Sequence, residues 1–223
     1  MNRKAEPTRR SVLALSVSLL ALVSVSFAPA IALAAPKIVV LGDSLSAGYQ
    51  LPPGAAFPEK LQKALDAKGV AAEIVGAGVS GDTLAGGLSR LDWSVGDDAD
   101  AVIVELGGND ALRGLPVEKA RSSLETIITR LKERGKLVLL AGMMAPPNMG
   151  DAYVTEFNAM YGKLARKHDV MLYPFFLEGV AAVPELNLAD GFHPNEKGID
   201  VIVERILPDV KKLVAEAEEK GDS

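Results

Sequence analysis

The chain contains two histidines, His168 and His193, and no cysteine. A thiol nucleophile, a disulfide and a thiolate metal site are therefore excluded. A serine hydroxyl can still act as a nucleophile, but it needs an adjacent base, and a neutral imidazole is suited to that role. Asp190 lies three residues before His193, so one turn of chain can bring a carboxylate to the ring and fix its tautomer. His168 lies in the charged run RKHD, which is typical of a solvated helix end.

Four short polar segments carry the other candidate groups. They are residues 42–46 (GDSLS), 76–82 (GAGVSGD), 107–110 (GGND) and 190–194 (DGFHP). Ser44 supplies a hydroxyl, Gly81 a backbone N–H in a glycine-rich turn, and Asn109 a side-chain amide. Acyl transfer needs such donors for its oxyanion, and losing one costs roughly 3–4 kcal/mol of transition-state stabilisation. Each segment alone could be a plain turn, but the four together favour acyl transfer.

Hydrophobic periodicity indicates the elements that must position these groups. Strands are expected at residues 37–41, 72–75, 101–106, 137–141 and 170–172. Helices are expected to end at Gly69, to cover residues 83–91, to run from Pro116 to Gly135, and to include residues 154–164 and 199–214. Pro208 is expected to kink or split the last helix.

Apolar strands that alternate with helices predict a parallel sheet covered on both faces. We therefore expect an α/β protein with a three-layer α/β/α, flavodoxin-like fold and five strands in the order 2-1-3-4-5. Ligands bind beyond the carboxyl ends of the strands in such sheets, near the point where the strand order reverses. The polar segments follow strands or precede the last helix, so this edge should hold them all.

Residues 1–34 have the composition of an export signal. Four basic residues precede a stretch from 11 to 36 without any charge, and Ala32-Leu33-Ala34 suits signal peptidase. The Arg9-Arg10 pair raises the twin-arginine route, and an uncleaved membrane anchor is the alternative. We expect cleavage near Ala34/Ala35, a periplasmic or secreted product with no stable membrane anchor, and a single domain over residues 35–223.

The charge of the chain bears on its partners. The net charge is −5, and it becomes −8 for residues 35–223 because the leader holds four basic residues and one acidic residue. An acidic domain argues against nucleic acid and anionic membrane as primary partners. We expect a small-molecule substrate and a monomer.

Residues 76–81 (GAGVSG) raise a rival function. They match the dinucleotide fingerprint G-x-G-x-x-G, with Glu105 as the acidic residue 24 positions after Gly81. Dinucleotide binding would leave the Ser44 and His193 segments without a role. It would also place the motif on the second strand, whereas a nucleotide-binding fold carries it on the first. A non-catalytic lipid- or carbohydrate-binding protein on the same fold is a third possibility.

The four segments, in this order, resemble the conserved blocks of the SGNH hydrolases, the GDSL esterase/lipase family. Residues 104–110 with 112–114 are similar to its periplasmic acyl-CoA thioesterase I/lysophospholipase type. The resemblance implies a serine esterase acting on an acyl ester or thioester, without metal or organic cofactor. It implies Ser44 as nucleophile, His193 as base, Asp190 as orienting acid, and Ser44, Gly81 and Asn109 as oxyanion donors. We expect Asp43, Leu112 and Pro146 to contact the substrate.

Overall fold

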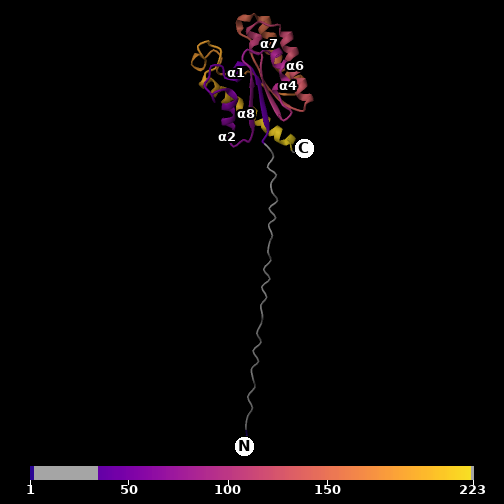
Figure 1. The fold of residues 1–223 in the computed structure, drawn as a ribbon, viewed down its shortest axis with the longest axis vertical. Helices are drawn as coiled ribbons and strands as arrows, with labels where there is room; N and C mark the ends of the chain where they lie inside the picture. The colour runs from indigo at the N-terminus through magenta and orange to yellow at the C-terminus, as the bar shows by residue number, and fades with distance from the viewer. Residues whose placement is uncertain (3–34, 222–223) are drawn as a thin grey trace. The chain divides into compact units, whose positions relative to one another are not determined.

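The computed structural model describes residues 1–2 and 35–221, so the predicted export signal lies outside the described residues. Five parallel strands form one sheet in the order β2-β1-β3-β4-β5, which confirms the predicted topology (Figure 1). The strands are β1 (Lys37–Gly42), β2 (Glu73–Gly78), β3 (Ala101–Glu105), β4 (Leu137–Ala141) and β5 (Met171–Tyr173).

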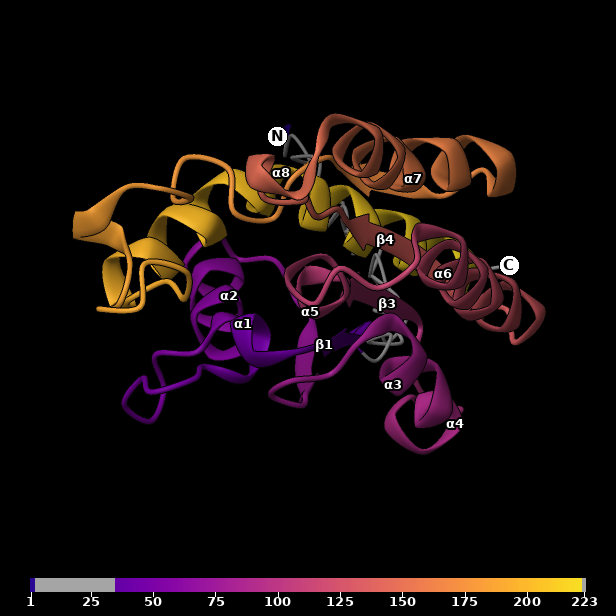
Figure 2. The same cartoon turned by 90° about the horizontal axis from the view of Figure 1, so that it is seen from above.

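Helices cover both faces of the sheet, as apolar parallel strands require. The helices are α1 (Ser44–Ala47), α2 (Phe57–Ala67), α3 (Leu84–Ser89), α4 (Leu91–Ser94), α5 (Gly108–Leu112), α6 (Val117–Glu133), α7 (Asp151–His168) and α8 (Glu196–Gly221), with the short turns η1 (Pro147–Met149) and η2 (Pro184–Leu186). Helix α2 packs against α8 on one face, whereas α3, α6 and α7 lie in a row on the other (Figure 2). The three layers are those expected.

The core is made by the strands and by the apolar stripes of these helices. Ile38, Val40, Ile103 and Leu139 are fully buried on the strands, and Phe57 on α2 is buried with them. Burying one such side chain stabilises a domain by about 1.5–3 kcal/mol. The sheet is therefore the rigid platform from which the polar segments project.

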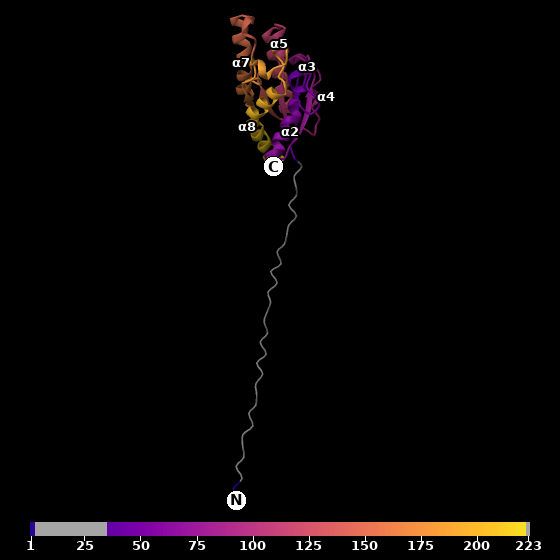
Figure 3. The same ribbon diagram turned by 90° about the vertical axis from the view of Figure 1, so that its left-hand side faces the viewer.

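The carboxyl ends of the strands share one edge because all strands run parallel. Short helices α1 and α5 begin directly after β1 and β3 at this edge. Figure 3 shows α5 at the end of the domain opposite to the C-terminus of the chain. The candidate groups after β1, β2 and β3 are thus carried to one end of the molecule.

Three predicted elements differ in the structure. Strand β2 runs to Gly78 rather than ending at Val75, because Gly76, Ala77 and Gly78 pair in register with β1. The predicted helix at 83–91 is two helices, since the chain turns at Arg90 with φ −107° and ψ 7°. Pro208 does not split the last helix. It lies on the exposed face of α8, where water can satisfy the carbonyl group that proline leaves without a donor.

Within residues 1–2 and 35–221, none of the helices has both the length and the apolar character needed to cross a bilayer.

Candidate active site

Ser44 is the first residue of α1, directly after β1. Its helix is capped by Asp43, whose Oδ1 accepts a hydrogen bond from Leu45 N at 3.0 Å. Gly42 is required before it, because a Cβ there would lie 2.2 Å from Ser46 Oγ and 2.6 Å from Glu105 Oε2. The tight turn presents the Ser44 hydroxyl at the sheet edge with only 6% of the residue exposed.

The Ser44 hydroxyl meets the imidazole of His193, 149 residues later in the chain. Ser44 Oγ lies 2.9 Å from His193 Nε2, and His193 Nδ1 lies 2.7 Å from Asp190 Oδ2. With the ring proton on Nδ1, facing the carboxylate, Nε2 accepts the Ser44 O–H. This is the geometry that activates a serine nucleophile.

Asp190 is held in place by its own loop. Its Oδ1 accepts hydrogen bonds from the backbone N–H groups of Phe192 at 2.9 Å and His193 at 3.0 Å. Burial would raise the pKa of Asp190, but these two N–H groups and the His193 ring outweigh it and lower that pKa to about 2. The carboxylate therefore stays charged through the neutral pH range and can orient the imidazole.

Two aromatic rings fix the imidazole from the sides. The ring of Tyr49 lies 4.5 Å from that of His193, and the ring of Phe192 packs edge-on at 5.1 Å. The backbone is anchored as well, since Leu188 N donates to His193 O at 2.7 Å. Tyr49 was not among the predicted site residues, and only its position five residues after Ser44 could have pointed to it.

Gly81 lies in the turn between β2 and α3 with φ +87°, a conformation that favours glycine. Arg113 holds the carbonyl of Gly81, since its Nη2 donates to Gly81 O at 2.9 Å, and the same Nη2 lies 3.4 Å from Asn109 Oδ1. Arg113 thus connects Gly81 and Asn109, two of the three predicted oxyanion donors. Sequence reasoning did not assign it a role.

Asn109 is the second residue of α5 and points toward the Ser44 segment. Its Nδ2 donates to Asp43 Oδ2 at 3.0 Å, which leaves the second amide proton for another acceptor. The start of α5 is tied to α3 by Asp110, whose Oδ2 accepts from Leu84 N at 2.9 Å. The structure therefore links the segments that carry Ser44, Gly81 and Asn109.

Asp43 occupies a different position from the one expected of a substrate contact. It is 1% exposed, and its two carboxylate oxygens bind Leu45 N and Asn109 Nδ2. Asp43 therefore holds the Asn109 amide in place by a hydrogen bond. Leu112, at the end of α5, is 46% exposed, and Pro146 is half-buried after β4, so both remain predicted substrate contacts.

Glu105 forms a buried acidic pair with Asp43. It is fully buried, its Oε2 accepts from Asp43 N at 3.3 Å, and its Oε1 has no hydrogen-bond partner among the described residues. Burial, and next the nearby Asp43 carboxylate, raise the pKa of Glu105 well above its ordinary value. Burial also raises the pKa of Asp43 to about 6, although hydrogen bonds from Leu45 and Asn109 oppose the rise.

Arg90 ties the ends of the first two strands together. Its guanidinium donates to Gly42 O at 2.8 Å, to Ala77 O at 2.8 Å and to Asp82 Oδ2 at 2.6 Å. Asp82 is next to Gly81, so Arg90 joins the turn that carries Ser44 to the turn that carries Gly81. The position of Arg90 at the end of the predicted helix did not indicate this role, because its acceptors lie in three separate segments of the chain.

The dinucleotide function loses its support here. Glu105 is enclosed in the core, so it cannot reach a ribose. Gly78 makes room for α1, since a Cβ there would lie 2.7 Å from Ala47 N and from Ser46 Oγ. The glycine segment also extends β2, an edge strand of the sheet.

His168 and a metal role can be treated briefly. His168 ends α7 and its Nε2 lies 2.9 Å from Glu125 Oε1 on α6, away from the Ser44 segment in the fold. Among residues 1–2 and 35–221, no three His, Cys, Asp or Glu side chains are grouped so that they could hold a metal ion.

This chain is similar to known proteins in sequence and in fold. The model of the GDSL-like lipase/acylhydrolase family matches residues 40–201. An arylesterase of Vibrio mimicus is 39% identical over 88% of this chain and 98% of its own length. Thioesterase 1/protease 1/lysophospholipase L1 of Escherichia coli (strain K12) is 38% identical over 82% of this chain and 87% of its own. The crystal structure of AlinE4, a SGNH-hydrolase family esterase, superposes with a TM-score of 0.68 at 46% identity over 80% of this chain and 96% of its own.

Proposed function

This chain belongs to the GDSL-like lipase/acylhydrolase family and is a carboxylic ester hydrolase, and we propose that it hydrolyses esters or thioesters of small or single-chain acyl groups through Ser44, His193 and Asp190. The observation that carries the proposal is the contact of 2.9 Å between Ser44 Oγ and His193 Nε2, with Asp190 2.7 Å from the other ring nitrogen.

The first half of the reaction forms an acyl-enzyme. Ser44 Oγ attacks the carbonyl carbon while His193 Nε2 takes the hydroxyl proton. Asp190 stays ionised and stabilises the imidazolium that results. His193 then gives the proton to the leaving alcohol or thiol, and the bond between the carbonyl carbon and the leaving group breaks.

The oxyanion is held by three donors in the proposed mechanism. They are the backbone N–H groups of Ser44 and Gly81 and the free amide proton of Asn109. Support comes from the links between their segments, because Asp43 accepts from the Asn109 amide and Arg113 donates to the Gly81 carbonyl. Donors fixed before the reaction need no reorganisation when the charge develops.

The second half releases the acid. Water enters on the side of His193, which takes its proton as the water attacks the acyl carbon. The tetrahedral intermediate uses the same donors, and Ser44 leaves with the proton returned by His193. No further group is required to complete the cycle.

The acyl group is proposed to lie over exposed apolar side chains at the sheet edge. Val79 follows β2, Leu112 ends α5 after β3, and Met144 follows β4, and each is more than 40% exposed. Exposed apolar residues that share one edge are typical of a binding groove. Met143, by contrast, is 3% exposed and belongs to the core.

The protein is proposed to act after export, as a monomer without a membrane anchor. The support for export is the leader, with a basic head, an uncharged stretch and Ala32-Leu33-Ala34. N-terminal sequencing of the exported protein should begin near Ala35. An intact leader on that protein would favour the anchor instead.

Replacing the nucleophile tests the proposal. Ser44→Ala should lower kcat/KM for p-nitrophenyl butanoate by at least about 10⁴-fold with the far-UV circular dichroism unchanged. Ser122→Ala, on the exposed surface of α6, is the matched control and should keep full activity. Substantial activity in Ser44→Ala would overturn the assignment of the nucleophile.

A further inference from the structure

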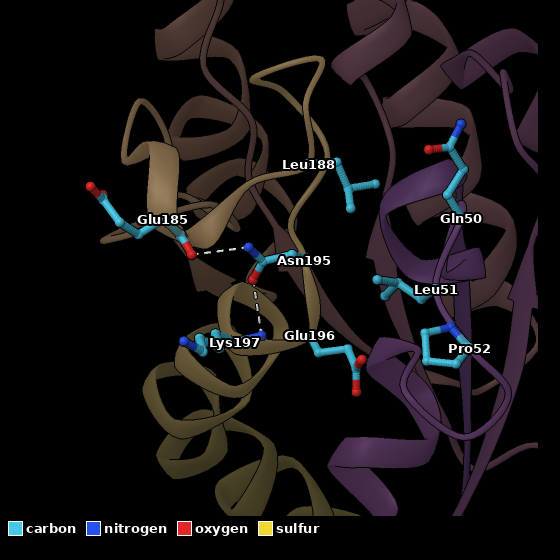
Figure 4. A pocket seen from close by; sticks show the side chains of 8 residues that line it. All are labelled: Gln50, Leu51, Pro52, Glu185, Leu188, Asn195, Glu196 and Lys197. Atoms are coloured by element: carbon cyan, nitrogen blue, oxygen red, sulfur yellow. Dashed lines mark hydrogen bonds between the residues drawn. The ribbon is translucent and has the colours of Figure 1, made fainter.

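A cavity of about 320 Å³ lies beside the candidate site, between the segment that follows α1 and residues 185–197 (Figure 4). Leu188 faces Leu51 across it, and Pro52 extends the apolar wall. The Gln50 amide lies at one end and the Glu196 carboxylate at the other. Its volume is at the lower end of the range for small-molecule sites.

The two walls of the cavity are continuous with the surroundings of His193. Leu188 N donates to His193 O, and the Tyr49 ring, which precedes Gln50, packs 4.5 Å from the imidazole. Asn195 lies two residues beyond His193. The cavity therefore borders the residues that hold the imidazole in place.

The wall next to α8 is rigid. Asn195 Oδ1 accepts from Lys197 N at 3.0 Å, and its Nδ2 donates to Glu185 O at 2.9 Å. Both bonds appear as dashed lines in Figure 4, where the side chains of Glu185 and Lys197 point away from the cavity. The charge that faces the interior is thus that of Glu196.

The reaction determines which part of a substrate lies next to the cavity. His193 Nε2 must reach the leaving-group oxygen in order to protonate it, so the rest of the leaving group continues past the imidazole. The exposed apolar residues Val79, Leu112 and Met144 follow β2, β3 and β4 instead. The acyl chain and the leaving group therefore have separate places.

We propose that this cavity is the leaving-group subsite, and that it takes uncharged aromatic alcohols in preference to anionic ones. This inference rests on the proposed hydrolase function. Leu51, Pro52 and Leu188 give the apolar contact that an aryl ring needs, and the Glu196 carboxylate repels a negative group. A net charge of −8 on residues 35–223 acts in the same direction.

Substrates with one butanoyl group and different alcohols test the subsite. Leu188→Trp fills the cavity and should lower kcat/KM for phenyl butanoate by about tenfold or more, while ethyl butanoate changes by less than about twofold. Pro52→Trp, from the opposite wall, should give the same selective loss without altering the His193 loop. If kcat/KM fell equally for both esters in both variants, the proposed subsite would be overturned, but the hydrolase function would not.

Two controls separate this proposal from the general one. Leu112→Trp, on the acyl side, should change the ratio between phenyl butanoate and phenyl hexanoate but not the ratio between phenyl and ethyl butanoate. Glu196→Gln should raise the ratio of kcat/KM for 4-(butanoyloxy)benzoate to that for phenyl butanoate several-fold; an unchanged ratio would overturn the charge preference. Failure of the wild-type protein to hydrolyse any of these esters would overturn the proposed function itself.

Discussion

The two sides of the candidate site are built in opposite ways. The Ser44 side rests on the ends of buried strands, where Asp43 and Glu105 are enclosed and Arg90 joins the turns. The His193 side is an irregular loop before α8, in which the Asp190 side chain is 41% exposed. The sheet fixes the nucleophile, whereas local hydrogen bonds and two aromatic rings fix the base.

The contrast extends to charge. Burial raises the pKa of Asp43 to about 6, while backbone N–H groups and the imidazole bring the pKa of Asp190 down to about 2 despite the opposing effect of burial. An aspartate on the Ser44 side is therefore easily protonated, whereas the aspartate on the His193 side stays ionised. An ionised Asp190 is what the proposed mechanism needs, because it must stabilise an imidazolium.

The largest expected effect concerns the loop side and distinguishes the two histidines. His193→Ala should reduce kcat/KM for p-nitrophenyl butanoate by about 10⁴-fold, because it removes the imidazole that contacts the Ser44 hydroxyl. His168→Ala, which loses the contact with Glu125 on α6, should stay within about twofold. Steady-state kinetics on both variants check this, and a reversed order would move the base to α7.

The next effect concerns the sheet side. Asn109→Ala removes a proposed oxyanion donor and should lower kcat by about 10²–10³-fold with little change in KM. Asn148→Ala, an exposed asparagine in η1, is the control for a lost amide. If Asn109→Ala raised KM and spared kcat, Asn109 would bind the ground state and not the transition state.

A smaller effect is expected at Arg90, which touches no proposed reacting atom. Arg90→Lys cannot reach Gly42, Ala77 and Asp82 together, so it should destabilise the fold by about 1–3 kcal/mol and lower kcat by about tenfold. Arg121→Lys, whose exposed ion pair with Glu118 lies within α6, should cost much less stability than Arg90→Lys, because solvent screens an exposed pair. Urea unfolding measures both variants; equal costs would mean that the guanidinium fork of Arg90 has no special role.

The smallest effect on activity is expected from the buried acid pair. Because the pKa values of Asp43 and Glu105 are raised on folding, the folded state binds protons more tightly, and stability falls as pH rises through about 4 to 6 and beyond. Asp190 has the opposite effect because its pKa is lowered on folding. The stability that it contributes at neutral pH is lost as the pH falls toward 2.

Glu105→Gln should therefore gain stability relative to the wild type as pH rises from 4.5 to 8, because the amide cannot ionise. Its kcat should stay within about threefold of the wild-type value. Chemical unfolding across this pH range provides the measurement. Parallel stability curves for the two proteins would show that Glu105 does not ionise differently on folding.

Much of this architecture could be predicted, and the exceptions have physical reasons. Strand β4 (Leu137–Ala141) matches its prediction because its apolar run lies between Gly135-Lys136 and Gly142 and is too short for a helix. Helices α1 and α5 could not be predicted, since four or five residues are too few to show a helical period. Candidate site residues could be named from the sequence where a chemical group is visible in it, as with Ser44 and His193.

Supporting residues were missed because their partners are distant in the chain. Arg90 binds carbonyl groups 48 and 13 residues away, and Asn109 binds Asp43 across 66 residues. Asp43 was expected to face the substrate, since the sequence shows its charge and not its burial. Such contacts depend on strand order and register, which fix neighbours only after the sheet has formed.

The most direct measurement is covalent trapping of the nucleophile. After incubation with a fluorophosphonate, mass spectrometry of peptides should place the adduct on Ser44, because a serine hydroxyl 2.9 Å from an imidazole is the activated one. The His193→Ala variant should label far more slowly and Ser44→Ala not at all. An adduct on Ser46 or Ser80, or undiminished labelling of His193→Ala, would contradict the account.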